Sequence, residues 1–173
     1  MKNCENLYFT MLDIDKFCEI YNNNLIRFYE FFGKDLENEQ LESTDINSYC
    51  VNKEDFYITD KHEQFELLIY TATKNDINIV LACNKNEMIV SASINKVDNI
   101  DEVSNELAKR LYLPFLSTIT GKNLEESVIT YREMIKAEKW YSQDDEFSYL
   151  LDDTYVFLIT NLILINFIPR KEE

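Results

Sequence analysis

The chain has 173 residues, a length that predicts a single domain over residues 1–173, and its 46% hydrophobic and 13% aromatic residues exclude a disordered segment. Its 32 acidic side chains against 17 basic ones give a formal net charge of −15, which repels nucleic-acid phosphates and acidic lipids. Direct nucleic-acid binding and membrane binding are therefore not expected. The cysteines form no C-x-x-C pair and no secretory signal is visible, so we expect a cytoplasmic location.

A long helix is predicted from about residue 10 to residue 32. Apolar side chains recur there at steps of three and four residues and form one stripe: Ile14, Phe17, Cys18, Tyr21, Leu25, Phe28 and Phe32. Gly33 follows where a left-handed helix cap is expected. The run Asn22-Asn23-Asn24 has low helix propensity, so a break in the middle of this helix is left open.

An irregular, acidic stretch follows over residues 34–64. A structureless connector of that length is unusual in a compact domain. We therefore expect a short helix near residues 35–42 and an edge strand near Phe56–Thr59. The rest of the stretch is expected to be a solvated loop, with a contact surface as the alternative.

Three short strands are predicted over residues 65–94, because apolar side chains alternate with a period of two in three successive runs. The runs begin near Phe65, Ile77 and Met88. Their short connections contain Asn and Asp, which tolerate turn geometry. Connections this short predict an antiparallel meander whose apolar face needs a cover of helices.

A second helix is predicted to begin at a capping box made by Asn99 and Glu102. Its apolar stripe extends to Leu111, and Pro114 is expected to end it. Residues 115–120 are then expected to be an extended piece.

A third helix is predicted after Gly121, one of only two glycines in the chain. Asn123 and Glu126 repeat the capping-box spacing. The apolar stripe that follows indicates a helix that reaches about Tyr141.

The segment from Thr154 to Pro169 carries no charged residue. It is shorter than the roughly 20 residues that a helix needs to span a bilayer, and its many β-branched residues favour strands. Two strands, about 155–159 and 163–167, are predicted, with one buried helix or a short tail anchor as alternatives. The predicted fold is thus α+β: an antiparallel sheet, made of the three-strand meander plus a C-terminal strand pair, covered by an N-terminal helix and two later helices.

Residues that carry catalytic chemistry are scarce. The two glycines exclude a glycine-rich phosphate loop and a dinucleotide fingerprint, which need several glycines at fixed spacing. The single histidine, His62, excludes a multi-histidine metal site, and its polar surroundings indicate an exposed turn. We therefore predict no catalytic residue, metal ligand or cofactor, and expect that the protein is not an enzyme.

One stretch mixes acids with aromatic side chains. Five acids occur without a base between Ser142 and Thr154, next to Trp140 and several tyrosines. Aromatic anchors among acids suit a basic protein surface, because aromatic side chains dominate interface energies while charge steers the encounter. The predicted partner-binding residues are Trp140, Tyr141, Asp144, Asp145, Glu146, Tyr149, Asp152 and Asp153.

These features favour an acidic, non-enzymatic binding protein that neutralises a basic protein by blocking a basic cleft, as a toxin-immunity protein or a nuclease inhibitor does. A second hypothesis is a chaperone or adaptor for an exported protein, because the order of one helix and then three strands resembles small, acidic, dimeric chaperones. A homodimer belongs to that alternative. A third hypothesis is a small enzyme that uses carboxylates alone.

Overall fold

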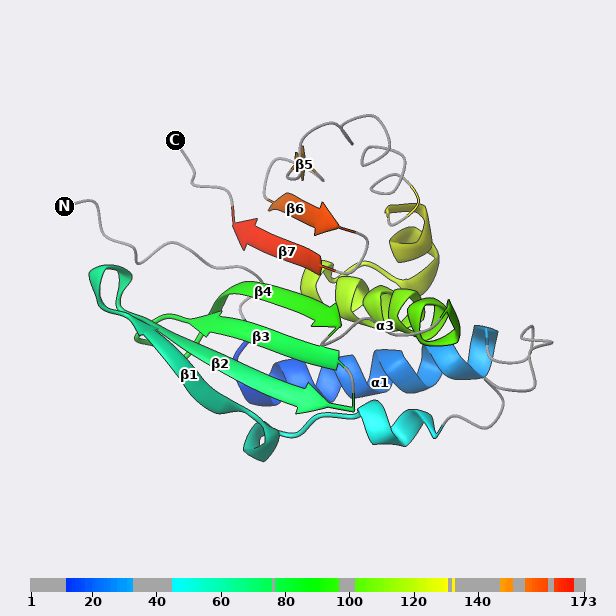
Figure 1. The fold of residues 1–173 in the computed structure, drawn as a ribbon, viewed down its shortest axis with the longest axis horizontal. Coiled ribbons are helices and arrows are strands. Elements are labelled where there is room, and N and C mark those ends of the chain that lie inside the picture. The colour runs from blue at the N-terminus through cyan, green and yellow to red at the C-terminus, as the bar shows by residue number, and fades with distance from the viewer. Residues whose placement is uncertain are drawn as a thin grey trace.

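The fold is α+β, as predicted, with helices packed on one face of an antiparallel sheet (Figure 1). A computed structural model describes residues 12–32, 45–75, 77–96, 102–130, 132, 147–150, 155–161 and 164–169. The longer elements are α1 (Ile14–Phe32), β1 (Tyr57–His62), β2 (Leu67–Lys74), β3 (Ile77–Cys83), β4 (Ile89–Lys96), α3 (Glu102–Thr120), a helix at 124–130, β5 (Phe147–Leu150), β6 (Tyr155–Asn161) and β7 (Leu164–Pro169). Short 3-10 turns are η3 (Ile46–Tyr49), η4 (Lys53–Asp55) and η5 (Glu63–Phe65).

The sheet has seven strands in the order β1-β2-β3-β4-β7-β6-β5, and all neighbours are antiparallel. The first four strands follow one another along the chain, so the predicted meander is confirmed and the predicted edge strand extends it to His62. The chain leaves the sheet after β4 and returns at the far edge as β5. Strand β7 then pairs with β4, with Ser93 opposite Asn166.

The uncharged C-terminal segment forms the predicted pair of strands. Strands β6 and β7 pair with each other, so the alternatives of one buried helix or a tail anchor are wrong. Strand β5 was not predicted, although Phe147-Ser148-Tyr149-Leu150 alternates with the period of a strand.

Period-two burial appears most clearly in β3. Its residues at odd positions, from Ile77 to Cys83, are buried against the helices, and those between them are half-buried on the other face. Phe65, placed at the start of the predicted meander, instead lies in the turn η5 and is exposed, because β2 begins only at Leu67.

Helix α1 covers the sheet together with α3. Asp13 caps its start, since a carboxylate oxygen accepts the backbone N–H of Lys16 at 2.8 Å. The predicted apolar stripe is buried over its described side chains: Ile14, Phe17, Cys18, Tyr21, Leu25 and Phe28. Residue Gly33 and the helix expected near 35–42 lie outside the described residues.

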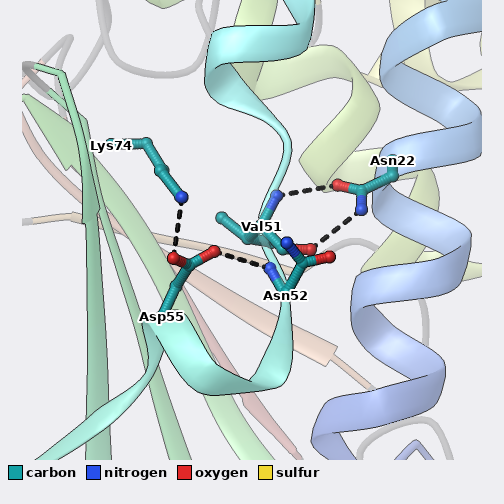
Figure 2. A network of polar contacts seen from close by, with 5 residues as sticks. All are labelled: Asn22, Val51, Asn52, Asp55 and Lys74. Atoms are coloured by element: carbon teal, nitrogen blue, oxygen red, sulfur yellow. Dashed lines mark hydrogen bonds and ion pairs between the residues drawn. The ribbon is translucent and has the colours of Figure 1, made fainter.

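The break left open at Asn22-Asn23-Asn24 does not occur, because two of these side chains are used in tertiary contacts. Asn22 donates to the carbonyl of Val51 at 2.8 Å and accepts its N–H at 2.9 Å (Figure 2). Asn24 donates to the hydroxyl of Thr118 at 3.1 Å. These hydrogen bonds hold α1 in place and outweigh the weak intrinsic preference of asparagine against a helix.

The predicted helix end at Pro114 and the extended piece over 115–120 are wrong: α3 continues through Pro114 to Thr120. A proline inside a helix costs about 3 kcal/mol. The three residues Phe115, Leu116 and Ile119 are fully buried, and each contributes about 1.5–3 kcal/mol by burial. Packing therefore exceeds the cost of the proline.

The helix α3 ends instead at the glycine. Gly121 has a φ of +68°, and its N–H donates to the carbonyl of Ser117 at 3.0 Å. The predicted capping box of the next helix is confirmed: the N–H of Glu126 donates to Asn123 at 2.9 Å, and the N–H of Asn123 donates to the Glu126 carboxylate at 3.1 Å. The stretch towards Tyr141 lies outside the described residues.

Candidate binding site

Of the predicted partner-binding residues, the structure describes one, Tyr149. Tyr149 lies in β5, opposite Phe157 of β6, at the edge of the sheet farthest from β1. The other predicted residues lie outside the described part of the chain: Trp140, Tyr141, Asp144, Asp145, Glu146, Asp152 and Asp153. The partner-binding role of these residues therefore stays a prediction.

A different acidic site lies where α1 begins. A cavity of ≈ 160 Å³, here called the acidic cavity, is lined by Asp13, Ile14, Asp15, Lys53, Phe56, Tyr70, Cys83 and Glu87. Its wall is apolar, because Ile14, Phe56 and Cys83 are buried core residues. Its three carboxylates and its lysine are exposed. The volume is close to the roughly 150 Å³ of a cavity that accepts a benzene-sized group.

The carboxylates reach this cavity from two elements. Asp13 and Asp15 lie at the N-terminus of α1, where the helix dipole favours negative charge. Glu87 lies in the β3–β4 turn with a φ of 61°. Asn84 shapes that turn, because its side-chain oxygen accepts the N–H groups of Asn86 at 2.9 Å and Met88 at 3.1 Å.

One backbone hydrogen bond joins the two acidic elements. The N–H of Ile89, the first residue of β4, donates to the carbonyl of Leu12 at 2.8 Å. The start of α1 is thereby held beside the turn that carries Glu87. This contact brings together carboxylates that are more than seventy positions apart in the sequence.

The polar network of Figure 2 positions the remaining side of the cavity. Asn22 binds the backbone of Val51, and the N–H of Asn52 donates to Asp55 at 2.8 Å. Lys74 of β2 forms an ion pair with Asp55 at 2.7 Å. The segment between Val51 and Asp55 is thus attached to both α1 and β2. It carries Lys53 and leads directly into Phe56.

The charge at the mouth of the acidic cavity is negative. Lys53 forms an ion pair with Asp15 at 2.7 Å, and their side chains are 51% and 63% exposed. Its hydrogen bond to Asp15, together with the charges of Asp15, Glu87 and Asp13, raises the pKa of Lys53. Such an exposed ion pair contributes little to stability. Three carboxylates against one ammonium leave the mouth suited to a cation.

Cys83, in the wall of the acidic cavity, is not a reactive thiol. Burial raises the pKa of Cys83 to about 12, and the charges of Glu87 and Asp13 act in the same direction. A thiol with that pKa stays protonated at neutral pH and is a poor nucleophile. Among the residues that the structure describes, no three His, Cys, Asp or Glu side chains are placed to hold a metal ion.

The prediction that His62 lies in an exposed turn is wrong: His62 is the last residue of β1. It is exposed and packs against the ring of Phe65, with the ring centroids 4.8 Å apart. Strand pairing with β2 extends through this residue, since His62 lies opposite Leu67. The polar composition around it reflects an exposed edge strand.

A second, larger hollow, here called the α1–α3 groove, lies farther along α1. Its volume is ≈ 680 Å³, and its lining residues are Ile20, Asn24, Arg27, Ser117, Gly121, Lys122, Asn123, Leu124 and Glu125. The charged residues of this lining are two basic ones, Arg27 and Lys122, and one acidic one, Glu125. The Lys122 ammonium also donates to the hydroxyl of Thr130 at 3.3 Å. The groove therefore has no strong excess of either charge.

Sequence reasoning missed the acidic cavity because its residues are not neighbours in the sequence. One signal was available: Asp13 stands directly before the apolar stripe of α1, where a capping residue is expected. A cap places an acid at a helix start, but nothing in the sequence places Glu87 beside it.

Comparison with known proteins gives no assignment: no family model, no curated protein and no solved structure matches the chain. Over the described residues, no helix has both the length and the apolar character needed to cross a bilayer. The function of the acidic cavity is therefore argued from its own geometry.

Proposed function

We propose that the protein is a cytoplasmic, non-enzymatic binding protein that neutralises a basic partner protein, and that the acidic cavity is a contact site for that partner. The observation that carries the proposal is the combination of an apolar wall with an excess of exposed carboxylates at one mouth. A protein of the immunity or inhibitor type uses such a surface to cover a basic cleft.

The cavity suits the side chain of a lysine or an arginine. The aliphatic stem of either residue packs on Phe56, Tyr70 and Cys83, while the charged head stays at the mouth. There the head meets Asp13 and Glu87, and it competes with Lys53 for Asp15. Since the Lys53–Asp15 pair is exposed, this exchange costs little.

The net charge of −15 adds a long-range contribution. An acidic surface raises the association rate of a basic partner, and salt screens this steering over about 10 Å at 0.1 M ionic strength. The proposed complex is therefore expected to form rapidly at low salt and to weaken as salt is added.

The test uses the full chain as bait in a lysate of the native host at low salt, with elution by a salt gradient and identification by mass spectrometry. The cavity variant is Asp13→Asn/Asp15→Asn/Glu87→Gln. Asparagine caps a helix about as well as aspartate, so α1 is preserved while three charges are removed. The matched control, Glu19→Gln/Glu30→Gln/Glu125→Gln, removes the same charge from exposed positions on helices.

A basic protein that binds the wild type and the control, and whose affinity for the cavity variant is at least tenfold lower, supports the proposal. Equal weakening by both variants means that only net charge matters and removes the cavity from the proposal. Capture of no basic protein by the wild type contradicts the function itself.

A further inference from the structure

Most of the large apolar side chains that are exposed in the described part of the chain lie along one edge of the sheet. Among the described residues, five large apolar side chains are exposed, and three of them belong to β1 and the turn after it: Tyr57 at 56%, Ile58 at 56% and Phe65 at 45%. The other two, Ile26 and Ile129, are on helices. Tyr57 and Ile58 are adjacent at the start of the strand and point to opposite faces of the sheet, and Phe65 lies past the other end of β1, so the three mark the length of the edge and form no single patch.

Strand β1 is also an open edge. It is the first strand of the sheet, it pairs on one side with β2, and all six of its residues are exposed. The backbone N–H and C=O groups on the other side of such a strand are available to a further strand, but in β1 the N–H of Lys61 already donates to the Asp60 carboxylate at 2.7 Å. We infer that the partner adds an extended segment to β1, so that the sheet gains a strand when the complex forms.

The edge carries features that restrict what can pair with it. Thr59 is a bulge, because Ile58 lies opposite Tyr70 and Asp60 opposite Ile69. The Thr59 hydroxyl lies 3.0 Å from that of Thr71 and fixes the bulge. Bulges and charged side chains discourage indiscriminate pairing of edge strands. The open, apolar part of the edge is thus the first half of β1.

The charges beside the edge select the partner. Asp60, Glu63 and Glu66 are exposed there, and the basic residues of the segment 57–66 are Lys61 and His62. A second copy of the chain would bring this negative segment against itself, and like charges across an interface oppose association. An extended segment with basic residues is favoured instead. This choice of charge rests on the proposed function, whereas the mode of docking does not.

The edge is continuous with the acidic cavity. Phe56, which forms part of the cavity wall, is the residue immediately before β1. Tyr70, also in the cavity, is the strand partner of Ile58. A segment on β1 therefore lies next to the site proposed for a basic side chain.

The experiment needs no identified partner, because its probe is a display library of random linear peptides selected against the full chain. Enriched peptides are expected to alternate apolar or β-branched residues with lysine or arginine. Their binding should be reduced at least tenfold by Ile58→Lys, which puts a charge on the open edge. The matched control is Ile129→Lys, since Ile129 is equally exposed at 57% but lies on a helix.

Amide hydrogen exchange of the protein with a bound peptide gives the second readout. Strand addition predicts new protection of outward amides in the first half of β1, from Tyr57 to Thr59. The docking mode is overturned if no peptide is enriched, if both lysine variants act alike, or if β1 gains no protection. Acidic or uncharged peptides that protect β1 overturn the charge preference alone. None of these outcomes depends on the cavity variant, so the proposed function is judged separately.

Discussion

The acidic cavity and the α1–α3 groove lie along the same helix and differ in almost every respect that matters for binding. The groove is about four times larger, ≈ 680 Å³ against ≈ 160 Å³, yet its charges nearly balance. The cavity is small, but it places three carboxylates beside a buried apolar wall. Volume alone would select the groove as a site. We favour the cavity because its excess of carboxylates lies next to a buried apolar wall. A site with that combination discriminates between partners of different charge.

The largest expected effect comes from a core residue that contacts both the wall of the acidic cavity and α3. Phe17 is fully buried, with ring centroids 6.4 Å from Phe56 of the cavity and 6.1 Å from Phe115 of α3. Phe17→Ala should lower the free energy of unfolding by about 3–5 kcal/mol. Urea denaturation measures this loss. Phe65→Ala, at an exposed position, serves as the control and should change stability little; equal losses would contradict the described core.

A second variant disturbs the cavity and spares the groove. Asn22→Ala removes both hydrogen bonds to the backbone of Val51 and leaves those groups without their partner. The expected loss of stability is about 1–3 kcal/mol, measured by urea denaturation. Its neighbour Asn23 is exposed, so Asn23→Ala should be neutral or slightly stabilising. A neutral Asn22→Ala would show that the network does not hold the segment 51–55 in place.

A pH dependence is expected from Asp55 in the same network. Partial burial acts to raise its pKa, but the hydrogen bonds from Lys74 and the N–H of Asn52, with the charge of Lys74, hold the pKa below its ordinary value. A carboxylate with a lowered folded-state pKa stabilises the fold above its unfolded pKa, and this contribution is lost as the pH falls through the folded value.

Asp55→Asn should therefore lower the stability by about 1 kcal/mol at neutral pH and by progressively less in acid. The measurement is urea denaturation of the wild type and the variant from neutral pH to about pH 2. Glu54→Gln, which removes one carboxylate at the exposed neighbouring position, is the matched control. Parallel pH profiles for wild type and Asp55→Asn would exclude the described ion pair.

The smallest expected effect on stability is that of Asp15→Asn. The pair with Lys53 is exposed and the charge of Asp15 interacts only weakly with the helix dipole, so the thermal midpoint should fall only slightly. The pKa of Lys53 should fall, because its hydrogen bond to Asp15 is the main cause of its rise. An NMR titration of the lysine side chains measures this change, with Glu19→Gln as a control. An unchanged Lys53 titration would mean that the pair does not form in solution.

Local patterns in the sequence predicted the local elements of the fold. The stripe of α1, the alternation of β3 and the capping box of Asn123 each depend on residues a few positions apart. Pro114 misled the prediction because its effect on a helix is local, while the burial of Phe115 and Ile119 that overrides it depends on packing against another helix. The pairing of β4 with β7 likewise has no local signal.

The candidate site was beyond sequence reasoning for the same reason. A search for clustered acids finds neighbours such as Asp144 and Asp145, because they are adjacent in the chain. The acidic cavity combines the start of α1, the segment before β1 and the β3–β4 turn. These segments meet only when the meander packs on α1. The sequence predicted each segment's structure, but not which of them share a surface.

The position of β7 beside β4 has a consequence for how the protein is made. Ile94 of β4 pairs with Ile165 of β7. The ribosome therefore synthesises the strand partner of β4 roughly 70 residues after β4 itself. At about 5–20 residues per second, that interval is several seconds. During it the segments of α1 and of the four meander strands have already been synthesised, while the strand that pairs with β4 is still missing. Synthesis, more than the finished fold, is the stage at which this protein is most exposed to aggregation.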